Sequence, residues 1–245
     1  MLHYHRQGTG EPLLLIHGFL STNRVYDKIR SDFVDTYDVI SIDLPGHGKS
    51  TLKNENTVYD YAHSIVQLLD SLKITNATWV GHSMGGYITM AAIEKYTPYV
   101  RRAAFVYSSP VHDSEKDKAQ RDEHIGLVKR EGVAALAKKR IPTYFAFQGE
   151  PKDVREAFRH ADQTTQEGAI AALHAMKERP NQVNMLNRVD LPLFFLEGTK
   201  DLSEAPFHAT SSQITKSSTD TSHMGMLDNP NQFITELKNW LTLTH

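Results

Sequence analysis

The stretch Gly81-His82-Ser83-Met84-Gly85 fits the pattern G-x-S-x-G, which places a serine between two glycines. Residues 77–80 before it form a short apolar run, and residues 86–93 after it combine small and apolar side chains, so we expect a strand, a tight turn and a helix. A turn this sharp holds the serine in a strained backbone conformation and projects its hydroxyl at the edge of a sheet. The pattern therefore predicts that Ser83 is a nucleophile that attacks carbonyl carbon atoms.

Two more apolar runs precede this serine, and each leads into a short polar motif. Residues 13–16 are typical of a strand buried on both faces of a parallel sheet, and His17-Gly18-Phe19 follows them. Residues 39–42 form the next run and lead into Asp43-Leu44-Pro45-Gly46-His47-Gly48-Lys49-Ser50. These two motifs and the serine turn, in this order, resemble the α/β-hydrolase superfamily.

The resemblance implies an acid and a histidine that follow the serine in that order along the chain. Glu197-Gly198-Thr199-Lys200-Asp201 directly follows an apolar run and is similar to the G-x-x-D acid turn of the family, so Asp201 is the expected acid. His223 comes after a weak polar strand and before the last helix, where the family has its histidine. Asp113, which follows the strand expected at residues 103–107, is the alternative acid.

The chemistry that these residues imply is acyl transfer. His223 would take the proton of Ser83 as its hydroxyl attacks an acyl carbonyl, an alcohol would leave, and water would hydrolyse the acyl-enzyme. Two backbone N–H groups would hold the oxyanion: that of Met84, at a helix N-terminus whose dipole favours negative charge, and, by resemblance, that of Phe19. No metal or organic cofactor is expected.

Strands and helices alternate over most of the chain, which predicts an α/β fold whose parallel sheet is covered by helices. The resemblance implies an α/β-hydrolase fold with about seven strands rather than eight, because the chain starts too close to His17 for the whole usual hairpin. The alternation stops between the strands expected at residues 103–107 and 193–196. We therefore expect a core of residues 1–110 and 189–245, with residues 111–188 inserted as a helical cap, or lid, rather than as a surface decoration.

An aromatic cluster, Tyr144-Phe145-Ala146-Phe147, interrupts this otherwise polar insertion. Apolar side chains in such a segment need something to cover, which is either the interior of the cap or a binding site. We expect Tyr144, Phe145 and Phe147 to bind an apolar acyl or alcohol group of the substrate. His82 is placed with them as a substrate-binding residue, although its side chain is expected to point away from Ser83.

The composition indicates one large globular domain. The chain has 245 residues, a net charge of −2, a pI near 6.7 and no cysteine, which excludes disulfides, thiolate catalysis and zinc–sulfur sites. Nothing indicates nucleic-acid binding, and Lys138-Lys139-Arg140 is interpreted as a solvated helix end. No apolar region follows the first residues as in a signal peptide, and no apolar run is long enough to span a membrane. We expect a cytoplasmic monomer or small homo-oligomer that acts on a small-molecule ester.

A serine at position 83 excludes the superfamily members that use an aspartate nucleophile, such as haloalkane dehalogenases and epoxide hydrolases. The G-H-S-M-G-G sequence is similar to that of carboxylesterases and enol-lactonases, which favours a carboxylic ester hydrolase. One alternative is a lyase similar to the menaquinone-pathway synthase, whose pattern has tyrosine and arginine where this chain has His82 and Tyr87. The other is a ligand receptor that keeps the triad but turns over slowly.

Overall fold

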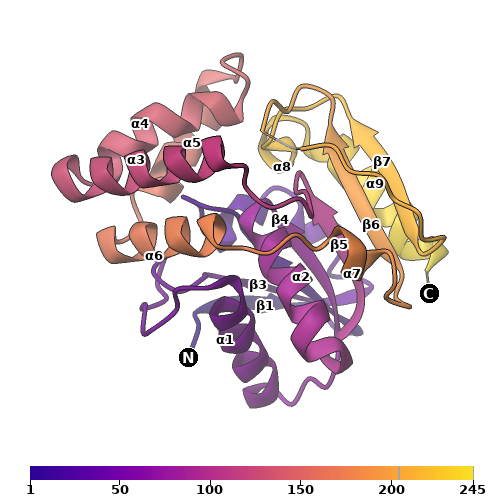
Figure 1. The fold of residues 1–245 in the computed structure, drawn as a ribbon. Helices are drawn as coiled ribbons and strands as arrows, with labels where there is room; N and C mark the ends of the chain where they lie inside the picture. The colour runs from indigo at the N-terminus through magenta and orange to yellow at the C-terminus, as the bar shows by residue number, and fades with distance from the viewer. Residues whose placement is uncertain (204, 245) are drawn as a thin grey trace.

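The computed structural model describes residues 1–203 and 205–244, and over this range seven strands form one sheet (Figure 1). The strands lie in the order β1-β3-β2-β4-β5-β6-β7, and neighbours are parallel except for β1 and β3. Their bounds are β1 (Tyr4–Gln7), β2 (Glu11–Ile16), β3 (Tyr37–Ile42), β4 (Ala77–His82), β5 (Val100–Val106), β6 (Leu193–Gly198) and β7 (Ile214–Thr219). This mostly parallel sheet confirms the α/β class and the strand number predicted from the sequence.

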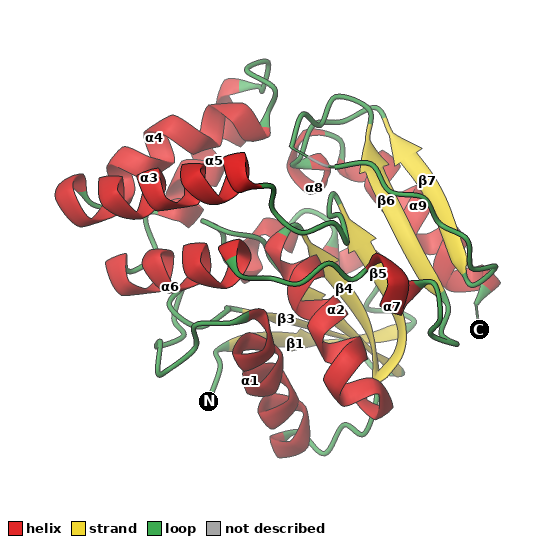
Figure 2. Cartoon of the chain, viewed as in Figure 1, coloured by secondary structure: helices red, strands yellow, loops and turns green. Residues whose placement is uncertain are grey.

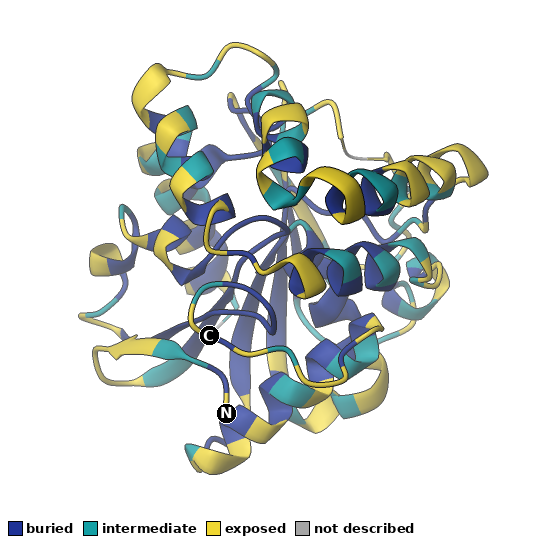
Figure 3. Ribbon diagram, turned by 90° about the vertical axis from the view of Figure 1, so that its left-hand side faces the viewer, coloured by how far each residue is buried: buried dark blue, intermediate teal, exposed yellow. Residues whose placement is uncertain are grey.

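The continuous apolar runs become strands that are buried on both faces. Residues 13–16 of β2 and all six residues of β4 are buried. The two edge strands, β1 and β7, are mostly exposed or half-buried, which explains the weak polar pattern predicted for the last strand. Figure 3 shows the buried strands at the centre of the molecule and the exposed positions on the outer faces of the helices.

Helices cover both faces of this sheet. On one face, α2 (Met84–Tyr96) packs on β4 and β5, and α1 (Val58–Ser71) packs on α2. On the other, α9 (Pro230–Leu243) packs on β7, and its Trp240 stacks on Phe194 of β6 with 5.3 Å between ring centroids. Phe195 points to the opposite face from Phe194, because side chains alternate along a strand, and its ring lies 4.6 Å from that of Phe105. Among the described helices, none combines the length and the apolar character needed to cross a membrane.

Residues 111–188, between β5 and β6, are built of helices and connecting loops and are called the helical segment below (Figure 2). It comprises α3 (Glu115–Glu131), α4 (Val133–Tyr144), α5 (Pro151–Ala161), α6 (Gln166–Lys177) and the short α7 (Val183–Leu186). The first of these packs on α4 and α6, and α4 packs on α5. In Figure 1 helices α3 to α6 lie together on the side of the loops that follow the parallel strands, whereas α7 lies beside β5.

The helical segment is fastened to the sheet where α6 meets the loop after β3. The backbone N–H of Thr165 donates to the carbonyl oxygen of Gly46 at 3.0 Å, and His47 pairs with Thr164 in an isolated β-bridge. A Cβ atom added to Gly168 would lie 2.3 Å from the same Gly46 oxygen. The two backbones can therefore touch only because glycine occupies both positions.

Candidate active site

Ser83 lies in the turn between β4 and α2, in a backbone conformation that residues other than glycine rarely adopt. Its φ is +50° and its ψ is −116°. Its N–H donates to the carbonyl oxygen of Val106 at 3.0 Å, and its own carbonyl accepts from the hydroxyl of Ser108 at 2.8 Å. These two bonds to β5 and the loop after it hold the strained residue in place, with Met84 fully buried as the first residue of α2.

Close backbone contacts surround Ser83. A Cβ atom added to Gly85 would lie 2.4 Å from the carbonyl oxygen of Ile16, so the turn packs directly against the end of β2. A Cβ atom added to Gly18 would lie 3.0 Å from the Cβ of Ser83. The loop after β2 therefore passes beside the serine, with Phe19 next in the chain, as a donor to an oxyanion at Ser83 would require.

His223, in the loop after β7, and Asp201, in the turn after β6, form a buried pair. Nδ1 of the histidine lies 2.7 Å from Oδ2 of the aspartate, and Ser203 donates its N–H and its hydroxyl to Oδ1 at 2.9 and 2.6 Å. Burial by itself raises the pKa of Asp201, but attraction to His223 and these hydrogen bonds outweigh it and lower the pKa to about 2. Asp201 is therefore ionised at neutral pH, and as an acceptor it fixes the histidine proton on Nδ1.

Both backbone groups of His223 are hydrogen-bonded by distant parts of the chain. Its N–H donates to the carbonyl oxygen of Tyr144, at the end of α4, at 3.1 Å, and its carbonyl accepts from Nε2 of His82 at 2.9 Å. Burial, and then the proximity of His223, lower the pKa of His82 to about 3, so this ring is neutral and donates only from Nε2. His82 is 2% exposed and supports the loop of His223 from within the core.

A cavity of about 370 Å³ opens between the core and the helical segment, and Ser83 and His223 both line it. Phe19 lines it on the side of the core. Tyr144 lines it on the side of the helical segment, with its ring 5.3 Å from the ring of His223. The structure thus brings the serine, the histidine and the predicted oxyanion loop to one space.

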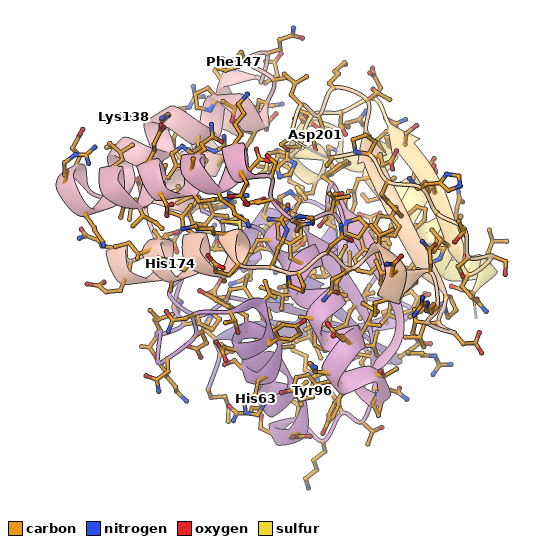
Figure 4. The ribbon with its side chains drawn as sticks, in the orientation of Figure 1. His63, Tyr96, Lys138, Phe147, His174 and Asp201 are labelled. Atoms are coloured by element: carbon orange, nitrogen blue, oxygen red, sulfur yellow. The ribbon has the colours of Figure 1, made fainter. Side chains whose placement is uncertain are left out.

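The aromatic cluster at residues 144–147 divides between two environments. Phe147, which is 72% exposed, lines the outer part of the cavity, across from the loop that follows Asp201 (Figure 4). Phe145 is 2% exposed and packs against Gly149 inside the helical segment, and it is not among the described residues that line the cavity. Tyr144 and Phe147 can therefore contact a ligand in this cavity, whereas the placement of Phe145 indicates a packing role.

The cavity is more strongly charged than the sequence indicated. Arg121 of α3, Arg140 of α4 and Arg179 after α6 all line it. The sequence predicts a solvated helix end at Lys138-Lys139-Arg140, but these residues lie within α4; the two lysines are exposed, whereas Arg140 is half-buried and lines the cavity. Lys138 is seen in Figure 4 on the outer side of the helical segment. No motif predicts these arginines, because they come from two helices and a loop and are 19 or more residues apart in the sequence.

Asp113, the alternative acid, bonds to two of these arginines. Its carboxylate accepts from Nε of Arg121 at 2.9 Å and from Nη1 of Arg179 at 2.5 Å. The carboxylate that reaches the ring of His223 is that of Asp201. Within the described part of the chain, no group of three or more histidine, aspartate or glutamate side chains is placed to bind a metal ion.

Comparison with known proteins connects this geometry to a family. Residues 11–160 match the profile of a family described by the α/β-hydrolase fold. A succinate-derivative hydrolase of Acinetobacter baylyi, named (E)-2-((N-methylformamido)methylene)succinate hydrolase, is 38% identical over 104 residues, which are 42% of this chain and 39% of that protein. The cis-3-alkyl-4-alkyloxetan-2-one decarboxylase of Shewanella oneidensis is 30% identical over 171 residues, 64% of this chain and 53% of that protein. The chain thus spans between a third and about half of the length of the curated relatives it matches.

Solved structures of other proteins match almost the whole chain. A thermophilic esterase from Thermogutta terrifontis, with malate bound, superposes with a TM-score of 0.90 at 26% identity, covering 100% of this chain and 94% of the other. The enol-lactonase of Burkholderia xenovorans superposes with a TM-score of 0.87 at 20% identity, covering 98% and 96% of the two chains, and shows the shared fold alone. Together with the family match, these structures confirm the fold predicted from the sequence.

Proposed function

The chain belongs to the α/β-hydrolase family, and on that premise we propose that it hydrolyses carboxylic esters through an acyl-enzyme on Ser83. One observation carries the proposal. A serine in a strained strand-to-helix turn lines the same cavity as a histidine whose Nδ1 is bonded to a buried carboxylate. That arrangement supplies a nucleophile, a base and the acid that orients the base. The full-length similarity to an esterase structure supports the choice of ester substrates.

The proposed mechanism follows from the position of the histidine proton. Because Asp201 holds that proton on Nδ1, Nε2 of His223 is the basic nitrogen and takes the proton of Ser83 as Oγ attacks the ester carbonyl. The backbone N–H groups of Met84 and Phe19 hold the oxyanion, each worth about 3 kcal/mol in the transition state. The histidine then gives its proton to the leaving alcohol, and a water molecule, activated in the same way, releases the acid.

The helical segment is the proposed cap of this site. Residues 111–188 would close the cavity over Ser83, with the core formed by residues 1–110 and 189–245. The support is that Tyr144 and Phe147 line the cavity from the helical segment, while Ser83, Phe19 and His223 line it from the core. A cap in this position would choose the substrate, because the core supplies only the reacting groups.

The test is turnover of a panel of p-nitrophenyl esters by the wild type and by Ser83→Ala. Alanine is small enough to keep the turn, so the variant should fold, fail to react with a fluorophosphonate and lose at least about 10⁴-fold in kcat. Ser71→Ala, at the exposed end of α1, is the matched control and should behave as the wild type. A Ser83→Ala variant that kept more than a few per cent of the rate would exclude Ser83 as the nucleophile. Labelling of the wild type without multiple turnover would instead indicate a receptor.

A further inference from the structure

The charged side chains of the cavity are unevenly paired. Of the described residues that line it, three are arginines and two are acids, Asp113 and Asp117, so these groups together carry one net positive charge. The chain as a whole carries a net charge of −2. Asp201, which is ionised and bonded to His223 on the cavity wall, adds one negative charge beside these groups, so the charges around the cavity balance in number. An anionic ligand is favoured by the position of a single cation instead, because a cation without a carboxylate partner attracts an opposite charge.

Two of the arginines are already held by the protein. Asp113 accepts hydrogen bonds from Arg121 and Arg179, and its side chain is 5% exposed. Arg179 also donates to the carbonyl oxygen of Val111 at 2.9 Å, and its guanidinium lies 4.0 Å from the centroid of the Tyr87 ring. These contacts make Arg121 and Arg179 parts of a fixed wall.

Arg140 differs from these two arginines in its partners. No described carboxylate forms an ion pair with it, and its guanidinium lies over the ring of Tyr144 at 5.3 Å from the centroid. The ring of Tyr144 in turn contacts the ring of His223. Lys139, the next residue along α4, is exposed and lies 4.0 Å from Glu123 instead. Arg140 is therefore a half-buried cation inside the cavity, one aromatic ring away from the proposed catalytic histidine.

We propose that the substrate is an ester that bears a carboxylate, and that Arg140 binds this carboxylate while the ester carbonyl lies at Ser83. The proposal rests on the proposed function and names its substrate class. A guanidinium matches a planar carboxylate with two parallel hydrogen bonds, and Arg140 has no carboxylate partner among the described residues. The ring of Tyr144 would lie between the carboxylate and the reacting carbonyl, against the carbon atoms that join them.

The experiment compares esters that differ only in this charge. One pair, monoethyl glutarate and ethyl 4-carbamoylbutanoate, places the carboxylate or its amide isostere on the acyl side. A second pair, carboxymethyl butanoate and carbamoylmethyl butanoate, places it on the alcohol side. Each kcat/KM is divided by the rate of hydroxide hydrolysis of the same ester, so that intrinsic reactivity cancels. In at least one pair, the wild type should prefer the carboxylate by about 10-fold or more, and added salt should reduce this preference.

The variants separate charge recognition from packing. Arg140→Gln should lower kcat/KM for the carboxylate ester about 10-fold more than for its amide isostere, so that the preference is lost. Arg140→Lys should keep part of the preference, because the charge remains but the planar fork is lost. Lys139→Gln is the control, since it removes a charge from the same helix outside the cavity.

The outcomes that would overturn the proposal are distinct from failure of the proposed function. If the wild type hydrolyses the amide esters by way of Ser83 but shows no preference for the carboxylate in either pair, the carboxylate proposal is wrong and the ester hydrolase stands. If Arg140→Gln slows both members of a pair equally and so keeps the wild-type preference, Arg140 has a packing role alone. If no ester in either pair is turned over and the fluorophosphonate does not label Ser83, both proposals fail together.

Discussion

Replacing Asp201 with asparagine should move the proton of His223 from Nδ1 to Nε2. Oδ1 of Asp201 accepts from the N–H and the hydroxyl of Ser203, and a backbone N–H can only donate. The amide oxygen of the new asparagine must therefore face Ser203, which turns its NH₂ group towards Nδ1 of His223. A donor at that position forces Nδ1 to accept, so Nε2 becomes protonated and cannot take a proton from Ser83.

The expected loss is large because the geometry stays intact while the base is blocked. The corresponding change in the serine triad template lowers kcat by about 10⁴-fold, which is about 5.4 kcal/mol in activation free energy. We expect a loss of this order for p-nitrophenyl butyrate. Asp113→Asn should cost much less in kcat, since that carboxylate bonds to Arg121 and Arg179 rather than to His223.

Two measurements check this reasoning at different levels. Steady-state rates, normalised to the concentration of folded enzyme, give the loss in kcat. Nitrogen-15 NMR of the imidazole shows which ring nitrogen of His223 carries the proton in the wild type and in the variant. An Asp201→Asn variant within about 10-fold of the wild-type rate, or one whose Nε2 stays unprotonated, would refute the argument, and a dead Asp113→Asn variant would transfer the role of acid to that residue.

Three further predictions concern stability and specificity. Because the pKa of Asp201 is lowered to about 2, its charge contributes about 2 kcal/mol of stability, which is present above the ordinary carboxyl pKa near 4 and is lost as the pH falls through 2. The difference in urea unfolding free energy between the wild type and Asp201→Asn should therefore shrink from pH 5 downwards. Gly168→Ala should lower the free energy of unfolding by about 1–3 kcal/mol, because its Cβ would push α6 away from the backbone of Gly46. Gly126→Ala should raise it by up to about 1 kcal/mol, because its Cβ would meet only the flexible end of an arginine, at 3.0 Å. Melting temperatures that shift in the same direction for both variants would contradict this. Burial of the acyl chain is expected to raise kcat/KM about fourfold per carbon atom, and Phe147→Ala should reduce this gain. The control Leu243→Ala, whose side chain is exposed on α9, should leave the dependence on chain length unchanged. If the wild type and both variants show the same dependence, Phe147 is not part of the binding site.

The parts of the site that follow strands could be predicted because their signals are local. Ser83 directly follows β4, and Asp201 and His223 lie in the short loops after β6 and β7; parallel strands bring the ends of these three strands to one edge of the sheet. A reader of the sequence needs only the strand boundaries to expect these three residues together. The buried apolar runs that define those boundaries are also what determine the sheet.

The lining of the cavity could not be predicted in this way. Lys138, Lys139 and Arg140 are successive residues of one helix, and side chains there are separated by about 100° of rotation, so the packing of α4 alone decides which of them faces inward. The same holds for Tyr144 and Phe145, of which the first lines the cavity and the second is buried within the helical segment. Patterns of charge and aromaticity show that such residues are present, but the rotation of each helix against its neighbours decides what they face.

The hydrogen bond from the N–H of His223 to the carbonyl of Tyr144 limits how this protein could be re-engineered. A helical segment transplanted from a relative, or shortened to widen the cavity, would have to present a carbonyl oxygen at the same point, since a buried N–H left without a partner costs free energy comparable to a lost hydrogen bond. Chimeras joined at residues 111 and 188 would therefore lose activity even though every reacting side chain is present, because the loop that carries His223 would no longer be held in position. A design that keeps the last turn of α4 as part of the core, and exchanges only the helices beyond it, would leave that anchor in place.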